Sequence, residues 1–214
     1  KLIEGVHRFQ SEDFGRYSAL FQKLSNEGQK PHTLFITCSD SRILAELITR
    51  SQPGDLFVVK NIGNIVPPAS ATGSTNSTAA AIEFAVGDTG VQDIVVCGHS
   101  QCGAMAALVG PHANGGGEGE GKRHLREWLR IAAPVQEVIQ RNYTHLMDDP
   151  DALLNAAAEE NVLFALQNLK TFPAVQAGLE KGTLHLHAWF FKIATAELFA
   201  FDPEAGQFRP LVRK

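Results

Sequence analysis

The sequence predicts an α/β fold in which a mostly parallel central sheet is flanked by helices. Strand-like apolar runs alternate with helix-like patterns along the chain, and this alternation is typical of parallel strands joined by helical crossovers. A length of 214 residues with 44% hydrophobic residues is enough for one sizeable core. The strand-like runs are residues 33–38, 55–61, 93–98 and 183–193, with a weaker run at 197–202. We therefore expect about four parallel strands and one further strand at an edge.

The predicted helices fill the gaps between these strands. In each of them apolar residues recur at the three- and four-residue spacing of a helix face. These helical patterns cover residues 42–50, 77–86, 103–109, 125–143 and 152–172. The run at 183–193 mixes His185, His187 and Lys192 with apolar residues. Because a fully buried parallel strand is almost continuously apolar, this run is predicted to lie nearer a sheet edge.

The chain begins with a segment that lies outside the alternation of strands and helices. Apolar residues in the first 26 positions follow helical spacing, and the pattern is broken near Gly15 and Gly28. We expect two short amphipathic helices that form an N-terminal arm over residues 1–28. Amphipathic helices need a surface to cover. Residues 29–214 then form a single α/β domain.

Composition and charge exclude several classes of function. The formal net charge of −4 and the lack of any long Lys/Arg run argue against a nucleic-acid surface. No apolar stretch approaches the roughly 20 residues that a membrane span requires, and no secretory signal is visible. Three cysteines cannot all pair within one chain, so we expect a reducing compartment such as the cytoplasm.

Two predicted strands end in side chains that bind metals. Residues 33–38 end at Cys38, and residues 93–98 are followed by His99 and Cys102. If the two strands are neighbours where the strand order reverses, the three side chains converge. Two thiolates and one imidazole suit tetrahedral Zn²⁺ and leave a fourth position open, which is typical of a catalytic site. The alternative is that all three are ordinary core residues. Cys97 should alternate away from the cluster and be buried and inert.

The chain resembles the β-class carbonic anhydrases at these residues. The segments "CSDSR" (38–42) and "HSQC" (99–102) correspond to that family's Cys-x-Asp-x-Arg and His-x₂-Cys motifs. The connecting segments "QPGDLFVVKNIGNIVPP" (52–68) and "AAIEFAV" (80–86) are also similar, and the resemblance runs from about Gln29 to the last strand. It implies one Zn²⁺ per chain, held by Cys38, His99 and Cys102, and reversible hydration of CO₂ to bicarbonate and a proton by zinc-bound hydroxide.

The resemblance also implies the remaining site residues. Asp40 would accept a hydrogen bond from the hydroxide, and Arg42 would keep Asp40 ionised and oriented. Without a metal, the same two residues are a helix cap and a solvated arginine. The residues implied for the substrate pocket are Gln29, Phe57, Ile62, Phe84 and the backbone amide of Gly103. Phe84 would come either from the same chain or across a dimer interface.

The family divides into subtypes, and this chain is expected to have the open site of the plant-like one. In the other subtype the aspartate can close the site, and bicarbonate binds to a tryptophan, an arginine and a tyrosine. The matching positions here are Phe35, Lys60 and Phe191, which all differ. The resemblance further implies a homodimer that often doubles to a tetramer, with the N-terminal arm packed on a neighbouring subunit. It also adds a carboxysome or a plastid stroma to the cytoplasm as expected compartments.

Three other functions stay open on the sequence alone. Relatives use the same zinc site to hydrolyse carbonyl sulfide or carbon disulfide, and the motifs do not distinguish these substrates from CO₂. A non-catalytic, zinc-stabilised binding module is disfavoured because a structural site would close with a fourth ligand. A metal-free nucleotide-binding domain is disfavoured because no glycine-rich phosphate loop follows a strand. The stretch 110–123 is expected to be a surface loop because of its glycine content, and a phosphate-binding role is disfavoured because no strand leads directly into it.

Overall fold

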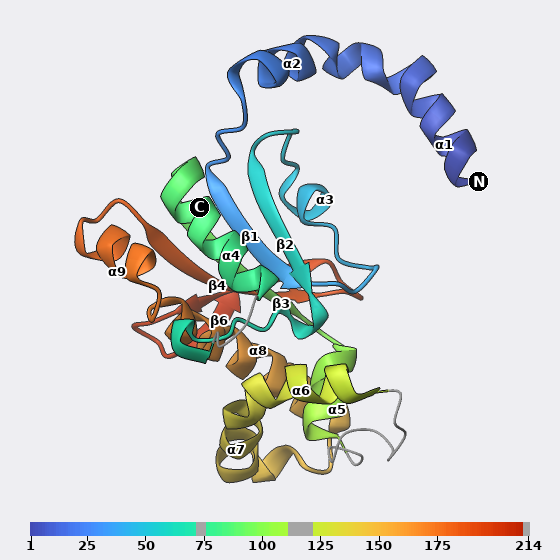
Figure 1. Cartoon of the computed structure of the whole chain (residues 1–214). Coiled ribbons are helices and arrows are strands. Elements are labelled where there is room, and N and C mark those ends of the chain that lie inside the picture. The colour runs from blue at the N-terminus through green and yellow to red at the C-terminus, as the bar shows by residue number, and fades with distance from the viewer. Residues whose placement is uncertain (72–75, 111–121, 212–214) are drawn as a thin grey trace.

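A six-stranded sheet forms the centre of the molecule (Figure 1). The computed structural model describes residues 1–71, 76–110 and 122–211. The strand order is β2-β1-β3-β4-β5-β6, with parallel pairing from β2 to β4 and antiparallel pairing of β5 and β6. The strands are β1 (Thr33–Cys38), β2 (Leu56–Asn61), β3 (Asp93–His99), β4 (His185–Lys192), β5 (Glu197–Asp202) and β6 (Gln207–Pro210). The predicted α/β fold with a mostly parallel sheet is confirmed.

The helices after α2 cover both faces of the sheet and its carboxyl end, whereas α1 and α2 project from the body of the molecule. They are α1 (Leu2–Arg8), α2 (Phe14–Glu27), α3 (Ala45–Thr49), α4 (Ser77–Phe84), α5 (Gly103–Val109), α6 (Arg123–Leu129), α7 (Ala133–Asn142), α8 (Pro150–Leu169) and α9 (Pro173–Glu180). The long helix α8 packs on β3 and β4. In Figure 1, α5, α6 and α7 gather at the end toward which the parallel strands point. No described helix is long and apolar enough to cross a membrane.

The core divides into three clusters because successive strand residues point to opposite faces. Leu34 and Ile36 pack with α4, α8 and α9 on one face, whereas Phe35 packs with residues around α3 on the other. A third cluster lies beyond the carboxyl end and includes Cys38 and Cys102 together with side chains of α5, α7 and α8. The thiols of Cys38 and Cys102 are thus surrounded by apolar side chains.

The strands near the C-terminal part of the sheet differ from the prediction. The segment expected near an edge, β4, is interior, because β5 pairs with its second half and β6 then forms the edge. The weaker run at 197–202, which was predicted to be the edge strand, is β5 and is also internal. The polar residues of β4 have a different explanation: the Asp93 carboxylate lies 2.7 Å from His187 Nε2 and 3.8 Å from His185 Nδ1. The short, polar β6, which ends at Pro210, gave no strand pattern in the sequence.

Several helix boundaries also differ from the expected ones. The single helix expected at 125–143 is divided by a 3₁₀ turn at Arg130–Ala132, with Pro134 in the first turn of α7. The pattern at 152–172 belongs to α8, which ends at Leu169, and α9 begins at Pro173. The pattern at 42–50 is reduced to α3. Most of the glycine-rich stretch, residues 111–121, lies outside the described residues.

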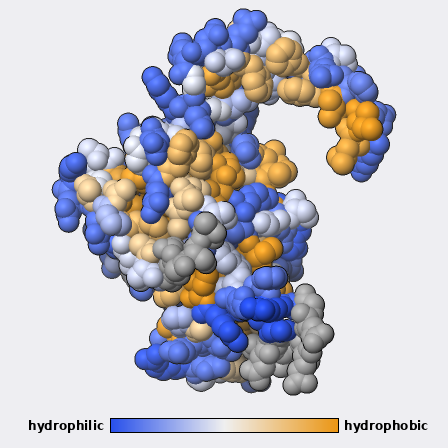
Figure 2. Space-filling view, in the orientation of Figure 1, coloured by the Kyte–Doolittle hydropathy of each residue, from blue (hydrophilic) through white to orange (hydrophobic). Residues whose placement is uncertain are grey.

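The N-terminal segment is helical, as expected, but it is not broken at Gly15. A π-helical segment at Phe9–Asp13 joins α1 to α2, and Gly15 lies inside α2, where one glycine is tolerated. The helix ends before Gly28, whose φ of 75° is the left-handed conformation that favours glycine. None of the residues in this segment is buried, and it projects from the body of the molecule (Figure 1). Figure 2 shows apolar side chains along it, among which Leu2 is 88% exposed.

We expect Gly98→Ala to destabilise the fold, because a Cβ there would lie 2.8 Å from Val162 Cγ2 and 3.2 Å from the Ala158 carbonyl oxygen. Overpacking of this kind costs about 1–3 kcal/mol of unfolding free energy. Urea denaturation measures the loss. The matched control is Gly87→Ala, whose Cβ would meet nothing within 4 Å, and it should change the unfolding free energy by less than about 0.5 kcal/mol. Equal stabilities of the two variants would contradict the close packing of α8 on β3.

Candidate metal centre

Three potential metal ligands meet at the carboxyl ends of two neighbouring strands. Cys38 is the last residue of β1, His99 is the last residue of β3, and Cys102 caps α5. The chain leaves β1 toward β2 on one side, while β3 lies on the other side, so the strand order reverses between them. All three residues are buried, and their potential ligand atoms lie within 4.8 Å of one another. The convergence expected from the sequence is confirmed.

His99 presents one buried nitrogen that has no hydrogen-bond partner among the described residues. Its Nδ1 lies 2.9 Å from the Ser100 carbonyl oxygen, which can only accept, so Nδ1 carries the proton. The lone pair of the neutral ring is therefore on Nε2, which is completely buried and unpaired. An unpaired buried polar atom is costly unless something not yet counted binds it. A metal ion coordinated by Nε2 would satisfy this atom.

The two thiols of the cluster are hydrogen-bonded to each other. A hydrogen bond from Cys102 lowers the pKa of Cys38 to about 4, against the opposing effect of burial, and the Gly63 amide also donates to Cys38 Sγ at 3.4 Å. The pKa of Cys102 is raised because it donates that hydrogen bond and is buried. Burial and mutual repulsion disfavour two adjacent thiolates, and a bound cation would allow both thiols to ionise. Together with the unpaired imidazole nitrogen, this donor set fits Zn²⁺.

Asp40 and Arg42 form a two-pronged ion pair beside this cluster. Arg42 Nη2 donates to Asp40 Oδ2 at 2.8 Å, and Arg42 Nε donates to Oδ1 at 3.0 Å. These hydrogen bonds hold the pKa of the Asp40 carboxyl well below its usual range. Asp40 Oδ2 lies 4.0 Å from His99 Nε2. Two atoms that both carry lone pairs thus face the same point, which again fits a cation or a hydrogen-bond donor placed between them.

Two further residues support this ion pair and were not expected from the sequence. Gln101 accepts from Arg42 through its side chain, at 3.2 Å, and through its backbone carbonyl, at 3.3 Å. Lys60 Nζ donates to the carbonyls of Asp40, at 3.2 Å, and Ile43, at 2.7 Å. Gln101 lies within the segment "HSQC", but nothing in that segment predicts a role for the glutamine side chain. Its contact with Arg42 depends on the packing of two turns that are far apart in the chain.

The residues expected to line a substrate pocket divide into two groups. Ile62 follows β2 and Gly103 begins α5, so both lie at the carboxyl end of the sheet with the metal ligands. Phe57 and Phe84 contact each other with their rings tilted by 40° and their centroids 5.9 Å apart, but Phe57 pairs with Leu34, four residues before Cys38. That separation corresponds to about 13 Å along a strand. Within one chain, the structure does not bring this aromatic pair to the metal ligands.

Gln29, the last of the expected pocket residues, lies even further from the cluster. It precedes β1, whereas Cys38 ends this strand, so the two residues are at opposite ends of the sheet. The interval from Thr33 to Cys38 alone corresponds to about 16 Å of extended strand. Gln29 of the same chain therefore does not reach the metal centre.

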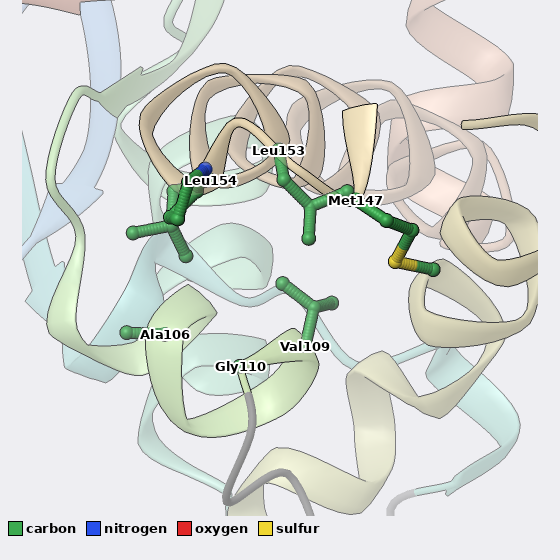
Figure 3. Close-up of a pocket in the computed structure, with 7 residues that line it drawn as sticks. Ala106, Val109, Gly110, Met147, Leu153 and Leu154 are labelled. Atoms are coloured by element: carbon green, nitrogen blue, oxygen red, sulfur yellow. The ribbon is translucent and has the colours of Figure 1, made fainter. Parts of the chain in front are cut away.

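A cavity of about 410 Å³ lies between α5 and the start of α8 (Figure 3). Its walls are mostly apolar and include Val109, Met147, Leu153 and Leu154. None of the expected metal-binding or substrate-binding residues lines it. The chemistry suggested by the donor atoms is thus located at the ends of β1 and β3 and not in this cavity.

Comparison with known proteins gives consistent matches. A family model described as carbonic anhydrase matches residues 33–198. A carbonic anhydrase of Synechocystis sp. is 40% identical over 94% of this chain and 70% of its own length, and one of Pseudomonas aeruginosa is 38% identical over 97% and 89%. The structure of the β-carbonic anhydrase CcaA aligns with a TM-score of 0.90 at 38% identity, covering 100% of this chain and 92% of that chain. A structure from a study of two tetrameric β-carbonic anhydrases of Sordaria macrospora aligns with a TM-score of 0.77 at 29% identity, covering 99% and 95%.

We expect the purified protein to carry one zinc ion per chain, because only with a cation can both buried thiols ionise. Cys102→Ser should lose most of this zinc, as measured by elemental analysis against protein concentration. The matched control is Cys97→Ser, since Cys97 is buried away from the cluster and burial raises its pKa to about 12. Zinc retained by Cys102→Ser, or lost by Cys97→Ser, would contradict this assignment of ligands.

Proposed function

The chain belongs to the β-class carbonic anhydrases, and on this premise we propose that it catalyses the reversible hydration of CO₂ to bicarbonate and a proton. We assign the zinc ion of this reaction to Cys38, His99 and Cys102. The observation that carries the proposal is the unpaired, buried Nε2 of His99, which faces two thiols and the Asp40 carboxylate. When bound, zinc supplies a Lewis acid that lowers the pKa of a coordinated water to near neutrality.

The role that we propose for Asp40 is to accept a hydrogen bond from the attacking water and so aim its lone pair at CO₂. This role requires an ionised carboxylate in a fixed direction. Arg42 provides both, because its two hydrogen bonds stabilise the charged form of Asp40 and define its plane. The Arg42 backbone N–H donates to Oδ1 at 2.9 Å, so Oδ1 has two donors and Oδ2 has one. Oδ2, the oxygen nearer His99, keeps a lone pair for the water.

We further propose that this enzyme has an open, unregulated site of the plant-like subtype. The three positions that would bind regulatory bicarbonate in the other subtype are engaged differently here. Phe35 is buried with its ring edge-on to Trp189, with centroids 5.9 Å apart, and Phe191 is also buried. The Lys60 ammonium is held by two backbone carbonyls. These contacts support packing and turn-holding roles for all three residues, in place of anion binding.

Residues 1–28 are proposed to be an arm that packs on a second subunit, and residues 29–214 the catalytic domain. The arm exposes the apolar side chains of Leu2, Ile3 and Val6, which need a partner surface. The proposed pocket residues Gln29, Phe57 and Phe84 lie far from the metal ligands of their own chain. They could contribute to a pocket only at the metal centre of a partner. Both features support a homodimer, and the tetrameric relatives from Sordaria macrospora support further assembly.

The proposed compartment is the cytoplasm or another reducing space. All three cysteines are free and buried. Two of them are proposed metal ligands and must be thiolates in the loaded enzyme, so oxidation would destroy the site. A reducing environment protects this arrangement.

The test of the proposed reaction is stopped-flow CO₂ hydration by the zinc-loaded protein and by Asp40→Asn. The asparagine has the shape of aspartate but lacks its charge, so we expect kcat/KM to fall about 10- to 100-fold at unchanged zinc content. A zinc-loaded wild-type protein without hydration activity would refute the proposal. Carbonyl sulfide and carbon disulfide are assayed on the same sample, and faster turnover of either would assign the site to that substrate.

The role of the arm is tested by removing residues 1–28 and measuring mass in solution by light scattering. We expect the full chain to be a dimer or a larger assembly and the truncated chain to be mostly monomeric, because the exposed apolar face of the arm is lost. Hydration activity should fall with the mass if pocket residues come from the partner. A truncated chain that keeps the mass of the full assembly would contradict the arm's proposed contact.

A further inference from the structure

We propose that Gln101 is a positioning residue, which anchors Arg42 and thereby keeps Asp40 beside the metal and not bound to it. This inference rests on the proposed function, since it concerns the orientation of the Asp40 carboxylate during CO₂ hydration. It adds a residue that is not one of the three potential metal ligands and whose side chain, within the described part of the chain, hydrogen-bonds to Arg42 alone.

The hydrogen bonds of Arg42 show why an anchor is needed. One edge of its guanidinium, Nε and Nη2, faces Asp40. Asp40 and Arg42 are on the same short turn, and the Arg42 side chain is 44% exposed, so their mutual hydrogen bonds alone would let the pair move as one unit. The contacts from Nη1 to Gln101 Oε1 and from Nη2 to the Gln101 carbonyl tie the pair to a different part of the chain.

The anchor itself is held in a fixed place. Gln101 lies between the ligands His99 and Cys102, in the turn that joins β3 to α5. The preceding residue, Ser100, donates its backbone N–H to the Phe191 carbonyl at 3.0 Å and accepts from the Ile193 N–H at 3.0 Å through its hydroxyl. The end of β4 therefore secures the turn. The same turn supplies two proposed metal ligands and the anchor of Arg42. The position of Arg42 is therefore fixed relative to these ligands.

The backbone of Gln101 adopts a conformation that its side chain does not favour. Its φ is 56°, the left-handed region that most non-glycine residues avoid. This conformation turns the carbonyl oxygen toward Arg42. A glycine would make the same turn with less strain. Strain at a turn that holds two ligands is consistent with a functional requirement for the glutamine side chain.

Asp40 lies so close to the ligand cluster that its position has to be restrained, and Gln101 provides this restraint through Arg42. Asp40 Oδ2 is 4.0 Å from His99 Nε2, so a small movement of the Asp40–Arg42 pair would bring the carboxylate onto the metal in place of water. Such a movement has to break the hydrogen bonds between Arg42 and Gln101. Gln101 thus makes the active arrangement more stable relative to the blocked one.

Three substitutions separate this role from a merely structural one. Gln101→Met keeps the length of the side chain but has no acceptor, and Gln101→Gly removes the side chain and relieves the left-handed strain. Gln101→Glu keeps an acceptor at the same reach and serves as the conservative rescue. Each variant is purified with zinc, and its zinc content, urea stability and kcat/KM for CO₂ hydration are measured.

We expect kcat/KM to fall about tenfold in Gln101→Met and Gln101→Gly, with one zinc per chain retained, and to stay within about threefold of wild type in Gln101→Glu. Gln101→Gly should be at least as stable as wild type. Stability and activity then change in opposite directions, which loss of folding cannot produce. Co²⁺-substituted Gln101→Met should also bind thiocyanate more weakly, since Asp40 would compete for the open metal position.

Other outcomes would contradict the role of Gln101. Wild-type activity in Gln101→Met, or a loss of activity that follows loss of zinc or of stability, would overturn the role of Gln101. If wild type hydrates CO₂ and Asp40→Asn is impaired, such a result leaves the proposed function standing. A zinc-loaded wild type that hydrates no CO₂ would overturn both the proposed function and the role of Gln101.

Discussion

The parallel pairing of β1 with β3 is the constraint on which the metal centre depends. Its register places Thr37 opposite Cys97, so both strands end at the same level of the sheet. The Thr37 hydroxyl reinforces this register by donating to the Cys97 carbonyl at 2.9 Å. A shift by one residue would turn Cys38 to the other face and separate it from His99. The apolar clusters on both faces oppose such a shift, because every buried side chain of the strand would move with it.

Electrostatics then sets the composition of the cluster. Without a cation, the two thiols are hydrogen-bonded to each other, the imidazole keeps a buried lone pair, and Arg42 favours the ionised form of Asp40. Each group is arranged to give electron density to a common point, and none can supply a positive charge to it. Arg42 cannot do so, because its donors are directed to Asp40 and Gln101. The protein thus provides the electron-pair donors of a metal site, and the positive charge has to come from a bound ion.

The sequence predicts the parts of this arrangement that depend on local pattern. The bounds of β1 and α5 are as predicted, because β1 is a continuous apolar run that ends before polar residues and α5 is a short, mostly apolar helix that begins directly after Cys102. Ligand spacing identified the three donors. The position of β4 was wrong, since the pairing of β5 and β6 depends on a polar four-residue strand that has no apolar pattern. Gln101 was missed because its hydrogen bonds to Arg42 follow from the packing of two distant turns.

The position of Gln29, a proposed pocket residue, links the proposed arm to the metal centre. Gln29 follows Gly28 directly, so it stands at the base of the arm, and no buried residue in the arm fixes it to its own chain. In a dimer held by this arm, its base would necessarily lie at the subunit boundary. A single second subunit would then cover the exposed apolar face of residues 1–28 and bring Gln29 toward the other chain's metal centre. The missing second subunit would then explain both why the apolar face of the arm is uncovered in one chain and why Gln29 does not reach the metal centre of that chain.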